Sequence, residues 1–171
     1  YAFNMQDPVV GGLTEKQRKL RHAISIAFDT EEKIAIFDNG RGTPSHGPIP
    51  PGIFGHEMSP RGINPVVYRW DAEAGGPVRR SIDEARKLLA EAGYPGGYGP
   101  DGRRLEIRFL SSWASAGMRT RVRFVRKQFA KLNIRLKVET SSGNVFLRKA
   151  LSGSFQFIHW GWRGDYPDPE N

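Results

Sequence analysis

Between residues 104 and 162 the sequence alternates between the spacing of strands and the spacing of helices. Apolar residues occupy every second position at 104–110 and at 134–140, which is typical of half-buried strands. A helix lies between them, and its apolar side chains fall within roughly 80° of arc; they are Met118, Val122, Val125, Phe129 and Leu132. A short helix at 144–150, capped by Asn144, and an apolar strand at 155–162 follow. This order predicts an α/β fold with a largely parallel or mixed sheet and flanking helices.

Three further helices are expected in the first half of the chain. Apolar residues recur at helical steps over 14–28, and a shorter helix is expected at about 31–38. Asn39 and Gly40 are suited to end that helix in the left-handed conformation. The third helix is expected over 81–92, because its first residues form a capping box and its apolar side chains form one stripe.

The segment between Gly40 and Arg80 carries no helical or strand periodicity. Its prolines and glycines at 47–52 cannot supply the amide donors that a helix or a central strand needs. An extended surface loop is therefore expected here. No domain boundary is evident within the sequence, so residues 1–171 are expected to form a single lobe of a larger protein from which the chain is an excised piece.

The composition excludes several kinds of covalent bond and functional site, and the positive net charge has more than one interpretation. The 171 residues include no cysteine, which excludes disulfides, thiolate metal sites and a cysteine nucleophile. Net charge is +8, and residues 119–149 hold ten basic side chains against one acid, Glu139. Such a concentration fits nucleic acid, an anionic membrane surface or an acidic partner, but it also fits the solvated face of an amphipathic helix.

No motif in the sequence predicts catalysis or a bound cofactor. The glycines at 97–102 match a dinucleotide-binding pattern, but they follow a helix and precede a strand, the reverse of the order that such a site needs. The four histidines lack the spacing of a metal site, and no nucleophile motif is present. We therefore expect a protein that is not an enzyme and that uses no cofactor or intrinsic metal.

The most distinctive segment is the aromatic, glycine-rich stretch at 159–169. It follows an apolar strand, and ligands in open α/β sheets bind beyond the carboxyl ends of strands. Asp165 is placed there. Strand alternation sends Ile158, Trp160 and Trp162 to one face and Phe157 and His159 to the other. Core packing and ligand contact both remain open for the tryptophans, and Asp165 is also suited to a turn.

At these residues the sequence resembles the extracellular solute-binding protein family 5, the dipeptide- and oligopeptide-binding proteins of ABC importers. Several segments match in order along nearly the whole chain. They are Phe3-Asn4-Met5 with Asp7-Pro8, residues 20–29, residues 47–52, residues 81–95, Trp160-Gly161-Trp162, and Asp165-Tyr166-Pro167-Asp168-Pro169. Each segment alone is a weak signal, whereas the ordered set is specific.

The resemblance implies one lobe of a two-lobed receptor that closes around its ligand outside the cytoplasmic membrane, in the periplasm or at the cell envelope. Residues 1–171 would be the second lobe, between two hinge crossings, with the first lobe absent from the chain. Residues 1–4 and 155–162 would enter and leave this lobe side by side. The implied partners are a peptide or another small solute, the missing first lobe and the membrane subunits of an ABC importer, and nucleic acid is not expected.

The resemblance also implies roles for four residues. Asp165 would hold the α-ammonium of a peptide, Trp162 would form an apolar wall of the pocket, and Trp160 and Tyr166 are weaker candidates for ligand contact. Some members place a basic residue at His159 to meet a ligand carboxylate, and that role is not carried over to histidine. The family accepts peptides, nickel chelates, sugars and other solutes. The alternative is a basic α/β module that binds nucleic acid or an anionic surface.

Overall fold

The computed structural model describes residues 1–47, 49–112, 115, 118–161 and 165–170. Its internal contacts divide the chain into two compact units. The first unit contains Tyr1–Phe28 and Ile82–Gly161, and the second contains Asp29–Ser81 and Trp162–Asn171. A single lobe spanning residues 1–171 stays a prediction.

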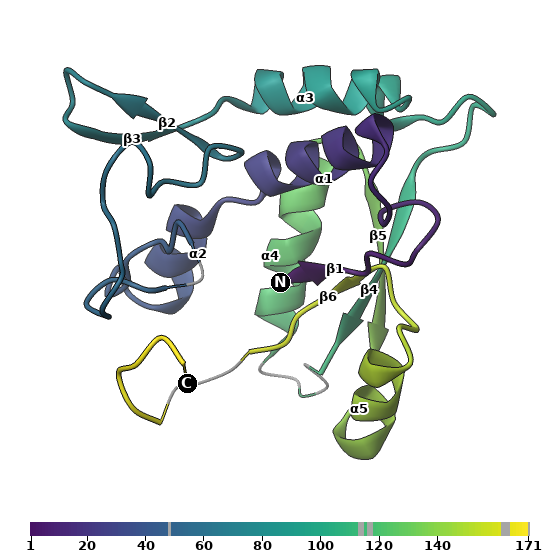
Figure 1. Cartoon of the computed structure of the whole chain (residues 1–171). Helices are drawn as coiled ribbons and strands as arrows, with labels where there is room; N and C mark the ends of the chain where they lie inside the picture. Colours follow the sequence, from purple (N-terminus) through teal and green to yellow (C-terminus); the bar gives the residue numbers. More distant parts are fainter. Residues whose placement is uncertain (48, 113–114, 116–117, 162–164, 171) are drawn as a thin grey trace. The chain divides into compact units, whose positions relative to one another are not determined.

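The first unit is built on a four-stranded mixed sheet in the order β1-β6-β4-β5 (Figure 1). The strands are β1 (Ala2–Phe3), β4 (Glu106–Ser111), β5 (Arg135–Thr140) and β6 (Phe157–Ile158). β4 runs parallel to both β5 and β6, whereas β1 pairs antiparallel with β6. This confirms the predicted α/β class, and the β1–β6 pairing confirms that the segments expected to enter and leave the lobe lie side by side.

Helices cover both faces of this sheet. They are α1 (Glu15–Ala27), α3 (Ile82–Glu91), α4 (Arg119–Ala130) and α5 (Gly143–Leu151), with a short 3-10 helix η1 at Pro95–Gly97. α4 packs on β5, α1 lies between α3 and α4, and α5 packs on β4 (Figure 1). Phe109 of β4 is buried on the α4 side, and Leu110 packs with Phe146 of α5 on the opposite side. The strand alternation therefore divides the core into two layers.

Three details of the predicted elements are wrong. Met118 of the expected α4 stripe is exposed, while Phe124 and Gln128 are buried, because α4 packs against α1 as well as against the sheet. α5 begins at Gly143, with Ser142 and not Asn144 in the capping position. β6 is two residues long where eight were expected, and its ladders with β1 and β4 are each only two residue pairs long.

The start of α1 is fixed by a capping box that the sequence analysis did not identify. The Thr14 hydroxyl accepts a hydrogen bond from the amide of Gln17 at 3.3 Å, and the Gln17 side chain reaches back to the Thr14 amide. Such a cap supplies partners to amides that the first helical turn leaves open.

Replacing Thr14 with alanine should therefore lower the free energy of unfolding of the complete protein by about 1 kcal/mol. Thr14→Ser, which keeps the hydroxyl, is the matched control and should stay close to the wild type. Urea unfolding at neutral pH measures both. Equal losses in the two variants would show that the hydroxyl of Thr14 does not stabilise the helix.

The second unit contains α2 (Thr30–Phe37) and a β-hairpin formed by β2 (Tyr68–Asp71) and β3 (Gly76–Arg79). α2 matches the expected helix, and Asn39 and Gly40 take the predicted left-handed conformation after it. The hairpin lies inside the segment that was expected to be an extended loop, so that prediction is wrong for residues 68–79. A sheet of two strands leaves an outer edge on each strand, which makes Pro77 tolerable in β3.

Candidate functional site

The candidate site begins at the carboxyl end of β6, where the alternation of side chains is as predicted. The Phe157 ring is stacked on Tyr1 at 5.6 Å and lies 5.6 Å from the Phe109 ring, measured between ring centroids. Ile158 points to the opposite layer, with Leu110 and Phe146. Both side chains are almost fully buried, so β6 anchors the residues that follow it.

His159 and Trp160 continue this alternation beyond the last paired residue. The His159 ring meets the Tyr1 ring edge-on at 4.9 Å, and its amide donates a hydrogen bond to the Leu110 carbonyl at 3.4 Å. Trp160 meets Phe146 edge-on at 6.1 Å and keeps 54% of its surface exposed. Trp160 is thus partly a core contact and partly an open aromatic surface at the sheet end.

The other predicted ligand residues belong to the second unit. Asp165 and Tyr166 are both exposed, and the backbone from 165 to 170 turns, with the Asp168 amide donating to the Tyr166 carbonyl at 3.0 Å. Trp162 lies outside the described residues. The structure thus places His159 and Trp160 on opposite faces at the carboxyl end of β6. The ligand roles given to Asp165, Tyr166, Trp160 and Trp162 stay predictions.

A buried polar network lies at the amino end of β6, and the sequence analysis did not assign it a role. The Asp7 carboxylate is 8% exposed and accepts hydrogen bonds from the amides of Val9 and Val10 at 2.8 and 3.0 Å. It also accepts one from the Gln156 side chain at 3.2 Å, and Gln156 in turn accepts one from the Arg108 amide at 2.8 Å. Because buried polar groups cost stability when unpaired, this network fixes the turn after β1 to β4 and β6.

Asn4 makes a second clamp beside this network. Its side-chain amide donates to the carbonyls of Gly153 and Phe155, at 2.8 and 3.1 Å. The Asn4 and Asp7 positions carried part of the family resemblance. In this structure both residues hold β1 to the segment around β6, which is the observable reason for polar side chains there.

The second unit has its own polar cluster, in which the exposed Glu31 carboxylate meets the buried Tyr68 and the partly buried Arg79. The Tyr68 hydroxyl donates to one oxygen of the Glu31 carboxylate, and Arg79 binds the other oxygen at 2.8 Å. Arg79 also lies over the Tyr68 ring, 5.6 Å from its centroid. Burial, and then the hydrogen bond to the Glu31 carboxylate, raise the pKa of the Tyr68 phenol well above its ordinary value. These contacts join α2 to the hairpin.

His46 packs edge-on against Tyr68, with ring centroids 4.6 Å apart. It is buried, and its Nδ1 atom has no hydrogen-bond partner in the described part of the chain. Burial lowers the pKa of His46 below its ordinary value of 6.5; the Glu31 carboxylate opposes this shift and His56 adds to it. The neutral ring is therefore the form that suits the fold.

His46 should make the protein less stable in mild acid. Above pH 6.5 the ring is neutral in both states, whereas below pH 6.5 the unfolded chain takes up a proton that the folded chain resists. The free energy of unfolding should fall as the pH drops below 6.5 towards the folded pKa. His46→Phe keeps a ring against Tyr68 but cannot titrate. Urea unfolding at several pH values should show a shallower pH dependence for His46→Phe, and an unchanged slope would contradict the prediction.

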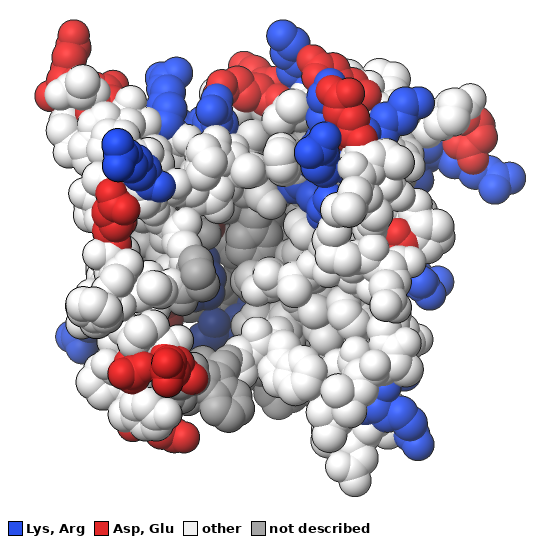
Figure 2. Space-filling view, in the orientation of Figure 1, with Lys and Arg blue, Asp and Glu red and all other residues white. Residues whose placement is uncertain are grey.

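The described residues contain no cluster of side chains that could hold a metal ion. None of the described helices is long and apolar enough to cross a membrane. Charges of both signs mix over α1 and α3, where Lys19 binds Glu15 and Glu91 at 2.8 and 3.0 Å (Figure 2). Acidic and basic side chains on this part of the surface therefore lie close enough to form ion pairs.

Comparison with known proteins decides the family. Residues 1–171 match the profile described as bacterial extracellular solute-binding proteins, family 5 Middle. The chain belongs to this family. Relatives of this family 5 chain include heme-binding protein A of Haemophilus influenzae and the dipeptide-binding protein of Escherichia coli, each 26% identical over 153 residues. The match covers 90% of this chain and 25% of each relative, so the chain spans about a quarter of their length.

The fold of this family 5 chain also matches a solved receptor structure. DppA of Helicobacter pylori, in complex with the peptide STSA, superposes with a TM-score of 0.70 at 23% sequence identity. The superposition covers 99% of this chain and 27% of DppA. The α/β fold described above is thus that of a segment of a two-lobed periplasmic binding protein.

Proposed function

We propose that this chain forms part of a solute receptor of an ABC importer, in which two lobes close around a peptide or a related small solute. The observation that supports this most strongly is the family match along all 171 residues. The superposition of nearly the whole chain on about a quarter of a peptide-loaded receptor gives further support. Binding by lobe closure buries most of a ligand, which suits a receptor that must carry a small solute without reacting with it.

In this proposal the residues at and beyond the end of β6 contribute to the ligand site. Trp160 presents an exposed aromatic face, and Asp165 presents an exposed carboxylate, which is the group that best binds a peptide ammonium. Trp162 and Tyr166 are the other proposed contacts. The rest of the complete protein would supply the opposing lobe, and the importer's membrane subunits would receive the closed receptor outside the cytoplasmic membrane.

Native mass spectrometry of the complete protein, purified without exchange of its bound solute, tests this proposal. A mass increment that disappears on partial unfolding, and that fragments as a short peptide, is the expected result. Calorimetric titration of the emptied protein with that peptide should then show binding, and native mass spectrometry of the mixture should show the mass increment again. A solute of another class would overturn the peptide assignment, and a protein that holds and rebinds no small solute would overturn the receptor proposal.

A further inference from the structure

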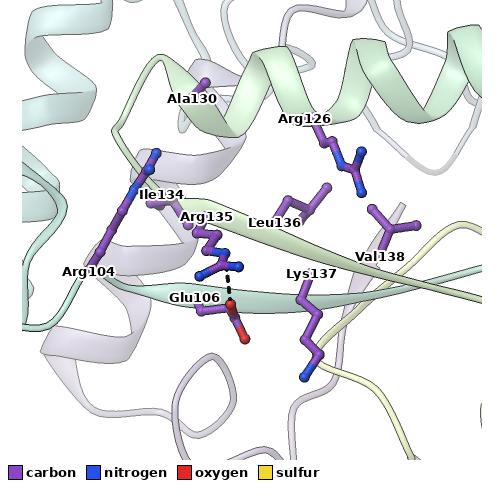
Figure 3. A pocket seen from close by; sticks show the side chains of 9 residues that line it. All are labelled: Arg104, Glu106, Arg126, Ala130, Ile134, Arg135, Leu136, Lys137 and Val138. Carbon is purple, nitrogen blue, oxygen red and sulfur yellow. Dashed lines mark ion pairs between the residues drawn. The ribbon is translucent and has the colours of Figure 1, made fainter.

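A groove of about 530 Å³ follows the outer edge of the sheet, along β5 and the second half of α4 (Figure 3). β5 is the terminal strand in the sheet order, so within the described residues no strand pairs with its outer side. The groove is lined by residues of β5, by residues that flank it, and by side chains from α4 and β4. They are Arg104, Glu106, Arg126, Ala130, Ile134, Arg135, Leu136, Lys137 and Val138.

The backbone of β5 leaves alternate residues open to this groove. The amides of Arg135 and Ser141 donate to carbonyls of Leu105 and Ser111, on the β4 side. In a parallel ladder alternate residues point to the same neighbour, so the odd-numbered positions face β4. The main-chain groups of Leu136, Val138 and Thr140 therefore point outwards, as they would to receive another strand.

The side chains around the edge are sorted by chemistry between the two faces. On the α4 side, Leu136 and Val138 form an aliphatic floor beneath Arg126 (Figure 3). On the other side, Arg135 and Lys137 project from β5, and Arg135 binds Glu106 at 3.2 Å. Four cationic residues thus line the groove against one carboxylate, and that carboxylate is already paired.

We propose that the β5 edge binds an extended acidic segment of another protein as an added strand. Main-chain hydrogen bonds to the outward groups of β5 would supply the pairing, and alternate side chains would supply the selectivity. The favoured segment alternates aliphatic residues, which face the floor on the α4 side, with glutamate or aspartate, which face Arg135 and Lys137. β5 extends over six residues, or about 20 Å, which sets the length of the segment.

Other occupants fit these features less well. A second copy of β5 would bring its own Arg135 and Lys137 to the edge, and this repulsion disfavours self-pairing. The groove lining contains no aromatic side chain on which nucleic-acid bases could stack. A membrane surface is flat, and it offers no main-chain partners to the hollowed strand edge. An acidic polypeptide strand can pair its carboxylates with the cationic side chains, pack its aliphatic side chains on the floor, and form hydrogen bonds with the main chain of β5.

Fluorescence anisotropy on the complete protein tests the proposal, with a labelled peptide of alternating valine and glutamate as the probe. The peptide of alternating valine and lysine should show no binding. Arg135→Glu combined with Lys137→Glu should weaken binding of the acidic peptide at least tenfold. Lys16→Glu combined with Lys87→Glu makes the same change in net charge at exposed positions on α1 and α3, which do not line the groove, and is the matched control. Thermal unfolding establishes that the variants are folded.

Two N-methylated forms of the probe separate strand pairing from simple charge attraction. Methylation of one alternate set of amides should abolish binding, while methylation of the other set, which faces away from β5, should leave it within about threefold. Equal binding of both forms would overturn strand pairing. Loss of binding in the matched control, absence of any binding to the complete protein, or binding only to vesicles of phosphatidylglycerol would each overturn the proposal as well. None of these outcomes depends on which solute the receptor carries.

Discussion

Replacement of Phe157 with alanine should lower the free energy of unfolding of the complete protein by about 3–5 kcal/mol. Phe157 is 3% exposed and belongs to β6, the two-residue strand that lies between β1 and β4 in the sheet. Its ring lies within 5.1–6.3 Å of five other aromatic rings, measured between centroids. They are the rings of Tyr1, Phe3, Phe28, Phe109 and Phe129. Removal of the Phe157 ring leaves a cavity, because the surrounding rings belong to several elements and cannot all move into the space.

The control for this prediction is Phe54→Ala, because Phe54 is 89% exposed. The same chemical change at that position should alter the free energy of unfolding by no more than about 0.5 kcal/mol. Urea unfolding followed by circular dichroism measures both variants. A loss of less than about 1.5 kcal/mol at Phe157 would mean that the surrounding rings collapse into the space, and that the Phe157 ring is not central to the packing of the sheet.

Asp165→Asn should weaken the binding of a peptide with a free amino terminus by about 2–5 kcal/mol, which corresponds to about 30-fold to several thousand-fold in Kd. The reason is that the enclosed ammonium would lose its counter-charge, while the size of the side chain stays almost the same. This prediction rests on the proposed receptor function. It is measured by calorimetric titration of the complete protein with the solute that it carries.

Two comparisons make the Asp165 result specific. Asp168→Asn changes the same charge three residues further on, at another exposed position, and should leave affinity within about threefold. The same peptide with an acetylated amino terminus should bind the wild type and Asp165→Asn almost equally. If Asp165→Asn and wild type bind the free-amine peptide with the same Kd, Asp165 does not hold the ammonium.

The element order and the fold class could be predicted from local patterns. Apolar periodicity at 104–110, 119–130 and 134–140 is a short-range property, because it reflects which side of each element faces the core. The helix ends at Asn39 and Gly93 could be located for the same reason, since both depend on one residue adopting a positive φ. Glycine and proline patterns were less reliable, and they concealed the hairpin at 68–79.

The candidate site could be predicted only in part. The alternation of Phe157, Ile158, His159 and Trp160 between two layers follows directly from strand geometry, and the structure confirms it. The hydrogen bond between the side chains of Asp7 and Gln156, at the amino end of β6, was not predictable. These residues are 149 positions apart, and no local pattern joins them. The exposure of Asp165 and Tyr166 was not predictable either, because it depends on which residues the fold places around them.

The sequence by itself determined the α/β class, the order of the elements along the chain and the family. These follow from residue spacing and from short motifs, which are local. Only the tertiary structure decided that β1 pairs with β6 in the antiparallel direction and in which register, that Asp7 and Asn4 fasten this pair, and that cations gather on both sides of the β5 edge. Each of these brings together residues that lie far apart in sequence or on different elements, and such contacts are fixed by packing of the whole unit.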